Sequence, residues 1–574
     1  MKTAFLRAEY PRPTFKRTSW ILLNGVWNFD FDDENIGLKN KYYNSNLLKQ
    51  KINVPFAYQS KLSGINKQEQ HYIMWYQKDF KVNISNKRYI LFFNRVDYYA
   101  SVYLNGYHLG DHEGGYSRFS FDITDYLKEN NTLTVRVEDY NNQRQPRGKQ
   151  CYDEPNRCWY QATSGIWQSV WIEEVGSNYF KDAKFVSDIH KNEVEATIST
   201  YTNKGSISLS ISYQGKVVSK QIIDIKSNES KVVVVIKPND YIDKLYYWSV
   251  NEPNLYDVTL ELLVADKVED RVETYFAFRE IKVVEGRILL NDIPIYQKLV
   301  LDQGYFDDGD LTPSKVELFK KDIEYCQEFG FNGARKHQKI EDEYYYYYAD
   351  ILGFLVWAEM PSAYEFSSFE ISKLSEQYLN IINELSNHPC IIVWVPLNES
   401  WGLNKILKDK QQQDYAKALY YLTKAIDKTR LISNNDGWEQ VDETDIIGVH
   451  DYAKDGSDFL NKYQLANIEN CYPMHRRLFA YGAKYLNQPL IMSEFGGITI
   501  QDNKVLKDCW GYNLPLSKEE FQKTLKNLID NIKLAYFVGY CYTQLSDVKQ
   551  EVNGLLDKDH NPKIEPKLVK DILK

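Results

Sequence analysis

The sequence has no apolar run near the roughly 20 residues that a membrane-spanning helix requires, so we expect no membrane partner. Its start, Met1 to Glu9, carries charge too early for the apolar core of a signal peptide. The seven cysteines show no close pairing pattern, and no cysteine–histidine cluster has the spacing of zinc ligands. We therefore expect reduced thiols in a cytoplasmic protein, with no metal and no cofactor.

Excess positive charge is also missing. The chain has 70 Lys and Arg against 79 Asp and Glu, a net charge of -9, which argues against nucleic acid as a main partner. No Gly/Ser-rich linker interrupts the 574 residues. Because one hydrophobic core rarely organises so long a chain, we expect about three domains that pack together.

Residues 1–178 alternate apolar and polar positions over short runs separated by turns. Ser101–Leu104 leads into Asn105-Gly106, a strong hairpin signal. We predict an all-β sandwich over 1–178. Residues 179–280 continue in β style, for example at Lys231–Ile236, and a segment of roughly 100 residues fits an immunoglobulin-like β-sandwich.

From residue 281 the pattern changes to alternating strands and helices. Thr312-Pro313 predicts the start of a helix that ends at Phe329, before Gly330. Candidate strands lie near 295–301, 331–335, 354–358, 390–395, 431–433, 446–449, 489–492 and 537–541. The helix after the fifth strand looks absent or very short. This predicts a catalytic (β/α)8 TIM barrel over 281–574; the alternative, an open doubly wound sheet, lacks a Gly-rich phosphate loop.

Two glutamates follow buried strands at the end where such barrels place their chemistry. Glu399 comes after the fourth strand and Glu494 after the seventh. Cleavage of a glycosidic bond needs one carboxyl to protonate the leaving oxygen and another to handle the anomeric carbon. Either residue alone is as readily an ion-paired or helix-capping group, but the pair at one rim favours a glycosidase.

Further polar and aromatic residues are predicted at the same rim. We expect Glu359 to pair with Arg335, while His337 and His450 suit hydrogen bonds to sugar hydroxyls or are satisfied strand-end histidines. Trp438 and Tyr452 suit stacking on a sugar face, with ordinary packing as the alternative. The candidate substrate-binding residues are Asn398, Arg335, His337, His450, Tyr452, Trp438, Glu359, Tyr542 and Gln544.

Several motifs together resemble glycoside hydrolase family 2, the group of β-galactosidases, β-glucuronidases and β-mannosidases. The motifs are Leu23–Phe29, Val102–Gly106 with Glu113–Tyr116, Ala162–Gln168 and Phe276–Ile281. The resemblance covers nearly the whole chain, and it implies that residues 1–178 form a sugar-binding-like, jelly-roll-like β-sandwich. It implies that Glu399 is the general acid/base, Glu494 the nucleophile and Asn398 a ligand of the 2-hydroxyl. It also implies that Arg335 and Tyr452 support the nucleophile.

The resemblance leaves the sugar open. Family β-glucuronidases carry an Asn-x-Lys element, whereas this chain has Leu555 two residues after Asn553. We therefore expect a retaining, exo-acting enzyme for short β-D-galactosides or α-L-arabinopyranosides. The alternatives are a β-glucuronidase or other β-hexosidase, an endo-acting glycanase and a non-catalytic carbohydrate-binding protein.

A homo-oligomer is possible. The loop 144–154 is expected to reach the pocket rim, or else to be an exposed loop.

Overall fold

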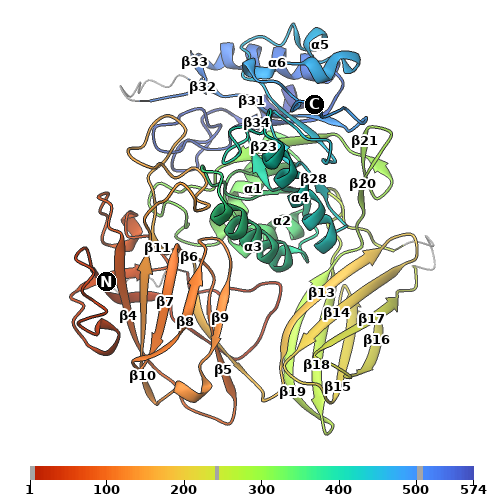
Figure 1. Ribbon diagram of the computed structural model, residues 1–574. Helices are drawn as coiled ribbons and strands as arrows, with labels where there is room; N and C mark the ends of the chain where they lie inside the picture. Colours follow the sequence, from red (N-terminus) through yellow and green to blue (C-terminus); the bar gives the residue numbers. More distant parts are fainter. Residues whose placement is uncertain (1–6, 239–244, 501–508) are drawn as a thin grey trace.

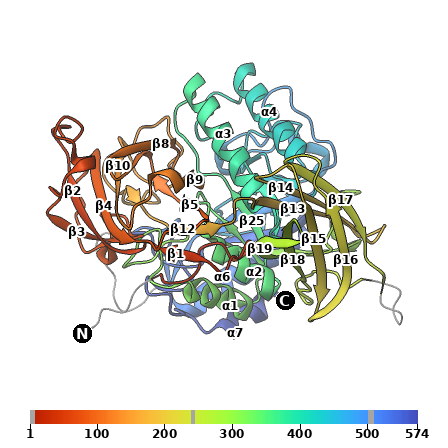
Figure 2. The ribbon, with the colours of Figure 1, turned by 90° about the horizontal axis from the view of Figure 1, so that it is seen from below.

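The computed structural model describes residues 7–238, 245–500 and 509–574. Figure 1 shows three parts: an N-terminal β-sandwich, a second β-sandwich and a barrel that holds the rest of the chain. In both views the two sandwiches flank the barrel (Figures 1 and 2). The predicted fold class, two β-sandwiches followed by an α/β barrel, is confirmed.

The N-terminal sandwich consists of two main antiparallel sheets. Asn105-Gly106 joins β7 to β8, and both residues have positive φ, as a two-residue hairpin turn requires. Between the sheets lies an apolar core that includes Trp27, Leu91 and Val135. One sheet contains β1 (Trp20–Leu22), β12 (Val170–Val175), β5 (Arg88–Phe93) and β9 (Phe119–Asp122). The other contains β3 (Gln50–Val54), β2 (Gly25–Phe31), β4 (Ile73–Lys81), β10 (Asn130–Glu138), β7 (Tyr99–Leu104) and β8 (Tyr107–Glu113), and β6 (Val96–Asp97) pairs with β11 (Gly165–Ile166).

The second sandwich has its own core, which includes Ile198, Leu209 and Leu260. Its first sheet contains β13 (Phe180–Asp188), β14 (Glu193–Thr200) and β17 (Glu229–Val235). Its second sheet contains β16 (Lys216–Asp224), β15 (Ser206–Tyr213), β18 (Tyr256–Val264) and β19 (Lys267–Phe276). A small sheet of β20 (Ile281–Val284), β21 (Arg287–Leu290) and β22 (Ile293–Pro294) leads into the barrel.

The barrel sheet has eight parallel strands, in the order β28-β26-β25-β24-β23-β34-β31-β30. All eight strands lie at the predicted positions: β23 (Gln297–Asp302), β24 (Gly333–Lys336), β25 (Leu355–Glu359), β26 (Ile391–Val395), β28 (Leu431–Ile432), β30 (Ile447–His450), β31 (Leu490–Gly496) and β34 (Phe537–Thr543). As expected, the described chain forms no helix between β28 and β30. There the short β29 (Asn435–Asp436), which pairs with β27 (Leu397–Asn398), approaches β30 so closely that a Cβ on Gly448 would lie 1.6 Å from Asp436 Oδ1.

The first barrel helix starts later than predicted, at Glu317, because Thr312 does not cap it. Its hydroxyl instead donates to the Trp167 carbonyl of the N-terminal sandwich at 2.5 Å. The helices are α1 (Glu317–Phe329), α2 (Glu343–Leu352), α3 (Ser368–Leu385), α4 (Lys410–Ile426), α5 (Phe459–Lys462), α6 (Lys518–Leu534) and α7 (Pro566–Leu573). Short 3-10 turns are Tyr42–Asn44, Lys61–Ser63, Thr124–Tyr126, Leu465–Asn470 and Pro473–His475, and β32 (Ile498–Ile500) pairs with β33 (Asn513–Leu516).

Buried ion pairs and loops join the three parts. Arg17 bonds Asp270 of the second sandwich at 2.8 Å and also pairs with Glu173 of the first. Arg95 reaches Glu384 of α3 at 2.5 Å. Among the described residues, no helix combines the length and apolar character that crossing a bilayer requires.

Candidate active site

Arg335, at the end of β24, is the centre of a buried polar cluster formed by the carboxyl ends of the barrel strands. It donates to Glu494 at 2.7 Å and to Asn398 Oδ1 at 2.5 Å. The same guanidinium lies 2.8 Å from Glu359 and 3.2 Å from Asp436. Residues that follow different strands therefore converge on one cation, which fixes their relative positions.

Glu494 lies at the floor of this cluster. One oxygen accepts from Arg335, and the other accepts from the Tyr452 hydroxyl at 2.6 Å. Glu399 contacts His450 Nδ1 at 2.7 Å and exposes 17% of its side chain, against 4% for Glu494. Carboxylate oxygens of the two glutamates lie within 4.8 Å of each other. Glu494 is thus anchored, whereas Glu399 faces the opening.

Electrostatics separates the roles of these groups. Burial alone would raise the pKa of Glu494, but His450 and Arg335 lower it to about 2, so the carboxylate is ionised. Burial alone would lower the pKa of His450, but the neighbouring Glu494, Asp436 and Glu399 raise it to about 10. His450 is therefore an imidazolium at neutral pH, placed between the two glutamates.

Glu399 lies in a strained turn that follows β27. Glu399 and Ser400 have φ of 51° and 60°, in a region that residues other than glycine rarely adopt. The Glu399 amide donates to the Asp436 carbonyl at 2.8 Å, and the Ser400 amide donates to Asn435 Oδ1 at 2.9 Å. These bonds to the segment after β28 hold a turn that aims Glu399 into the cluster.

Asn398 offers a hydrogen-bond donor to a ligand. Its carbonyl oxygen is taken by Arg335, but its buried Nδ2 has no hydrogen-bond partner among the described residues. His337 contacts Glu359, one of the carboxylates around Arg335. Its Nδ1 lies 3.1 Å from Glu359, and burial lowers the pKa of this histidine. The expected pairing of Glu359 with Arg335 is present.

Three further rim residues were expected, and their relation to the cluster differs. Tyr542 points away, because side chains alternate along β34: Thr543 bonds Tyr452 at 3.1 Å, while Tyr542 packs edge-on against Phe521 of α6. This corrects the expectation for Tyr542. Gln544 contacts Gln303 at 2.9 Å, and Trp438 lies at the rim, where its indole N–H donates to the Glu399 carbonyl.

Sequence reasoning missed Asp436 and Tyr512. Asp436 lies 3.0 Å from His450 Nε2, and the polar run Asn434–Asp436 after the fifth strand was the available signal. Tyr512 stacks face to face on Tyr452, with ring centroids 3.6 Å apart. Nothing local to its sequence marks it, because it lies just before β33, in the long segment after β31.

The loop 144–154 reaches the barrel mouth, where the amide of Gly148 donates to the Ser362 carbonyl at 3.2 Å. Lys149 is 4% exposed, and its Nζ lies 5.3 Å from the ring centroids of Trp159 and Trp401. The ring centroids of Trp401 and His337 are 6.1 Å apart. The N-terminal sandwich thus contributes a cation close to the cluster.

A metal ion fits this cluster poorly. Glu399, His450 and Glu494 have the proximity of a three-ligand site. However, both ring nitrogens of His450 already face carboxylates, Nδ1 at 2.7 Å from Glu399 and Nε2 at 3.0 Å from Asp436. A metal ligand needs a free imidazole lone pair, so the arrangement suits proton transfer.

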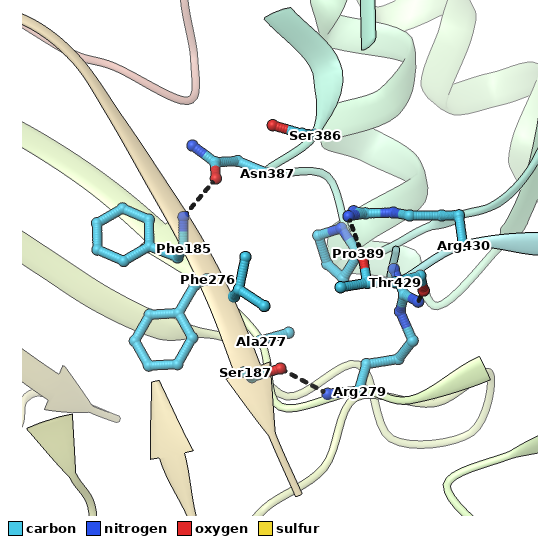
Figure 3. Close-up of a pocket in the computed structure, with 11 residues that line it drawn as sticks. Phe185, Ser187, Phe276, Ala277, Arg279, Ser386, Asn387, Pro389, Thr429 and Arg430 are labelled. Atoms are coloured by element: carbon cyan, nitrogen blue, oxygen red, sulfur yellow. Dashed lines mark hydrogen bonds between the residues drawn. The ribbon is translucent and has the colours of Figure 1, made fainter. Parts of the chain in front are cut away.

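A small cavity of about 30 Å³ lies at the other end of the barrel (Figure 3). It lies between Phe276 of the second sandwich and Arg430, which precedes β28. Arg279 there donates to the carbonyls of Thr429 and Ile391. No carboxylate lines this cavity, so it offers none of the chemistry of the Arg335 cluster.

Comparison with known families identifies the architecture. The model of the TIM barrel domain of glycosyl hydrolases family 2 matches residues 281–574. The chain belongs to this family. Two further models match: the glycosyl hydrolase 2 galactose-binding domain-like model over 38–178, and a model described as glycosyl hydrolases family 2 over 178–279. Family 2 membership, expected from the N-terminal and barrel-entry motifs, is therefore confirmed.

Named relatives of this family 2 chain include enzymes for different sugars. It is 27% identical to a β-galactosidase of Thermoanaerobacter pseudethanolicus over 68% of this chain and 52% of that protein. It is 23% identical to a β-glucuronidase of Streptococcus agalactiae over 89% and 87%. Among solved structures, Ruminococcus gnavus β-glucuronidase shares the fold, with a TM-score of 0.79, 19% identity and 99% coverage of both chains. The chain spans about half the length of the first two curated relatives it matches.

Proposed function

We propose that the protein hydrolyses terminal β-glycosides with retention of configuration, with Glu494 as nucleophile and Glu399 as acid/base. The observation that carries this proposal is that one carboxylate oxygen of Glu399 lies within 4.8 Å of one carboxylate oxygen of Glu494. Retaining glycosidases place their two carboxyl groups about 5–5.5 Å apart, whereas inverting enzymes leave about 6.5–9.5 Å for a water molecule.

The surroundings of each carboxylate suit its step. Ionised Glu494 attacks the anomeric carbon while Glu399 protonates the departing glycosidic oxygen, so one C–O bond forms as another breaks. Glu399 then takes a proton from the water that hydrolyses the glycosyl-enzyme. Asn398 Nδ2, buried and without a partner among the described residues, is placed to bind the 2-hydroxyl.

For the sugar, a neutral β-D-galactoside or α-L-arabinopyranoside is the first candidate. Leu555, which occupies the position of the glucuronidase lysine, is fully buried in the barrel core. Asn553 beside it bonds Glu551 at 3.1 Å. That segment therefore supplies no cation for a sugar carboxylate.

A β-glucuronide is the second candidate, and Lys149 is the observation that favours it. Its ammonium lies against the rings of Trp159 and Trp401 and forms a hydrogen bond with Cys158. Burial opposes the charge, but Cys158, Glu551, Glu494 and Glu399 raise the pKa of Lys149, so it is cationic near the cluster. A cation in this position can hold a uronic acid carboxylate.

A panel of chromogenic glycosides tests both candidates: β-D-galactoside, α-L-arabinopyranoside, β-D-glucoside, β-D-mannoside and β-D-glucuronide. Proton NMR of the first-formed anomer reports retention. Lys149→Met should change hydrolysis of a neutral sugar by less than about threefold, but lower glucuronide hydrolysis by about tenfold or more, since it removes a charge-assisted hydrogen bond. An inverted first product would contradict the mechanism.

Two other functions remain as outcomes of the same experiment. Sugar binding without cleavage of any glycoside would point to a carbohydrate-binding protein, and cleavage within polysaccharides to an endo-acting glycanase. Domain boundaries at 178 and 280, a cytoplasmic location and a homo-oligomer remain predictions.

A further inference from the structure

A second cavity, of about 390 Å³, opens on the N-terminal sandwich, and none of its lining residues belongs to the Arg335 cluster. This volume falls within the roughly 300–1,000 Å³ of small-molecule sites. It is lined by ends of strands in the six-stranded sheet, the loop after β10 and the start of α3. The aromatic lining residues are Tyr98, Tyr99, Tyr140 and Phe369. The polar lining residues are Glu113, Glu138, Asn142 and Gln145.

Strand register places a ring between two carboxylates. Tyr99 of β7 is directly opposite Glu138 of β10 on one side and Glu113 of β8 on the other. Residues opposite one another on adjacent strands project from the same face of a sheet. Tyr140 adds a second ring, whose hydroxyl donates to Glu138 at 3.1 Å and whose face stacks on Tyr72.

The rings are presented to solvent. Tyr140 is 51% exposed and Phe369 is 40% exposed. Both belong to segments that also contact each other: Arg144 pairs with Glu365 at 2.8 Å, between the loop after β10 and the segment before α3. These contacts hold two exposed rings from different domains at one opening.

The charges in this cavity are compensated. Glu113 pairs with Lys373 at 2.9 Å, and Glu138 pairs with Arg136. The carboxylates keep further acceptor lone pairs but leave no uncompensated charge for a cationic ligand. The buried hydroxyl of Tyr98 has no hydrogen-bond partner among the described residues, which leaves one donor available.

We propose that this cavity binds an uncharged saccharide unit. A pyranose ring has apolar C–H faces that pack on aromatic rings, and a rim of hydroxyls that bond carboxylates and amides. The combination of Tyr99, Tyr140 and Phe369 with Glu113 and Glu138 matches both properties.

The saccharide can come from two sources. Gln145 lines the cavity, and Lys149 lies at the mouth of the active site only four residues later; four extended residues span at most about 14 Å. One source is therefore the distal unit of a glycoside whose terminal sugar occupies the Arg335 cluster, a case that rests on the proposed function. The other is a separate glycan chain.

The test compares Tyr140→Ala/Phe369→Ala with Tyr107→Ala, each also combined with Glu494→Gln to prevent turnover. Tyr107 is a matched control, since it is 57% exposed on β8 of the same sheet and does not line the cavity. Calorimetric titration with neutral β-linked tetrasaccharides of glucose and galactose should show binding that weakens at least tenfold only in the double variant. Thermal unfolding checks that all variants fold.

Hydrolysis separates the two sources. The double variant should cleave a small aryl glycoside within about twofold of wild type. A tenfold lower kcat/KM for the tetrasaccharide alone would identify the cavity with the distal unit of the substrate; unchanged kcat/KM with weaker binding would identify a separate chain. Saccharide binding equal in all variants, or no binding, would overturn the proposal. Because titration needs no turnover, its result stands even if no glycoside is cleaved.

Discussion

Two carboxylate–histidine pairs lie at opposite ends of the barrel. At the carboxyl ends of the strands, Glu399 contacts His450 at 2.7 Å; near the amino ends, Asp350 of α2 contacts His388 at 2.6 Å. Residue type and distance are nearly the same in both pairs. Their surroundings differ in the access of solvent.

The Asp350 pair is closed. Its carboxylate also accepts from the Tyr275 hydroxyl at 2.7 Å and from the Cys390 amide at 2.9 Å, and the whole group is buried. It connects the second sandwich to the barrel. Glu399, by contrast, is partly exposed, and the Asn398 beside it keeps a donor that has no partner among the described residues. Access of solvent, more than residue type, distinguishes a candidate site from a structural network.

The buried arginines show the same contrast. Arg335 lies among carboxylates that hold its pKa well above the usual value, although burial alone would lower it. For Arg279, burial and the nearby Arg430 lower the pKa to about 9. At the carboxyl ends of the strands, carboxylates surround the Arg335 cation. At the amino ends, the buried arginines donate mainly to backbone carbonyl groups.

The largest expected effect comes from Glu494→Gln. The substitution keeps the shape but removes the nucleophile, so kcat should fall by about 10⁴-fold or more. Steady-state kinetics on the best chromogenic substrate measures this loss, with circular dichroism as the folding control. Retained activity would assign the nucleophile to another residue.

Arg335→Met should impair both activity and stability. It leaves Glu494, Glu359 and Asp436 without their shared cation, and removing one partner of a buried ion pair costs about 3–5 kcal/mol. Urea unfolding and kcat on the same samples measure the two effects. Loss of activity with unchanged stability would show that the carboxylates find other partners.

Asp350→Asn should lower the stability of the protein without lowering its activity, unlike Glu494→Gln. Leaving buried donors poorly paired costs about 1–3 kcal/mol in stability, but kcat of the folded protein should stay within about twofold. The contrast between the two ends would fail if this variant lost activity as Glu494→Gln does.

A last prediction concerns the pH dependence of stability. The pKa of His450 rises from 6.5 to about 10 on folding, so its contribution is fully present below about pH 6.5 and disappears as pH rises through about 10. Unfolding midpoints of the wild type should therefore decline over this window more steeply than those of His450→Gln. Parallel profiles would mean that His450 is neutral in the folded protein.

Much of the architecture was predictable because its signals are local. Apolar runs such as Ile391–Val395 mark strands buried on both sides, and a glycine such as Gly330, with φ of 95°, ends a helix. Glu399 and Glu494 could be placed at one rim for the same reason, since the carboxyl ends of parallel strands share one edge.

Other site features depend on contacts that no local pattern records. Helix α1 begins later than predicted because the Thr312 hydroxyl bonds another domain instead of capping the helix. Tyr542 turned outward because the alternation along β34 gives Thr543 the inward position. Lys149 reaches the site from the first sandwich, more than 100 residues before the barrel begins.

Hydrophobic periodicity acts over a few residues, so the amino-acid sequence is enough to predict the succession of two β-sandwiches and a barrel, and the pair of glutamates at its rim. The polar groups that surround the glutamates come from tertiary contacts. Asp436, Tyr512 and Lys149 join the site through packing between distant segments, and neighbouring charges there, acting against burial, keep His450 and Glu494 charged. Side-chain identity is local, whereas proximity and desolvation belong to the folded chain.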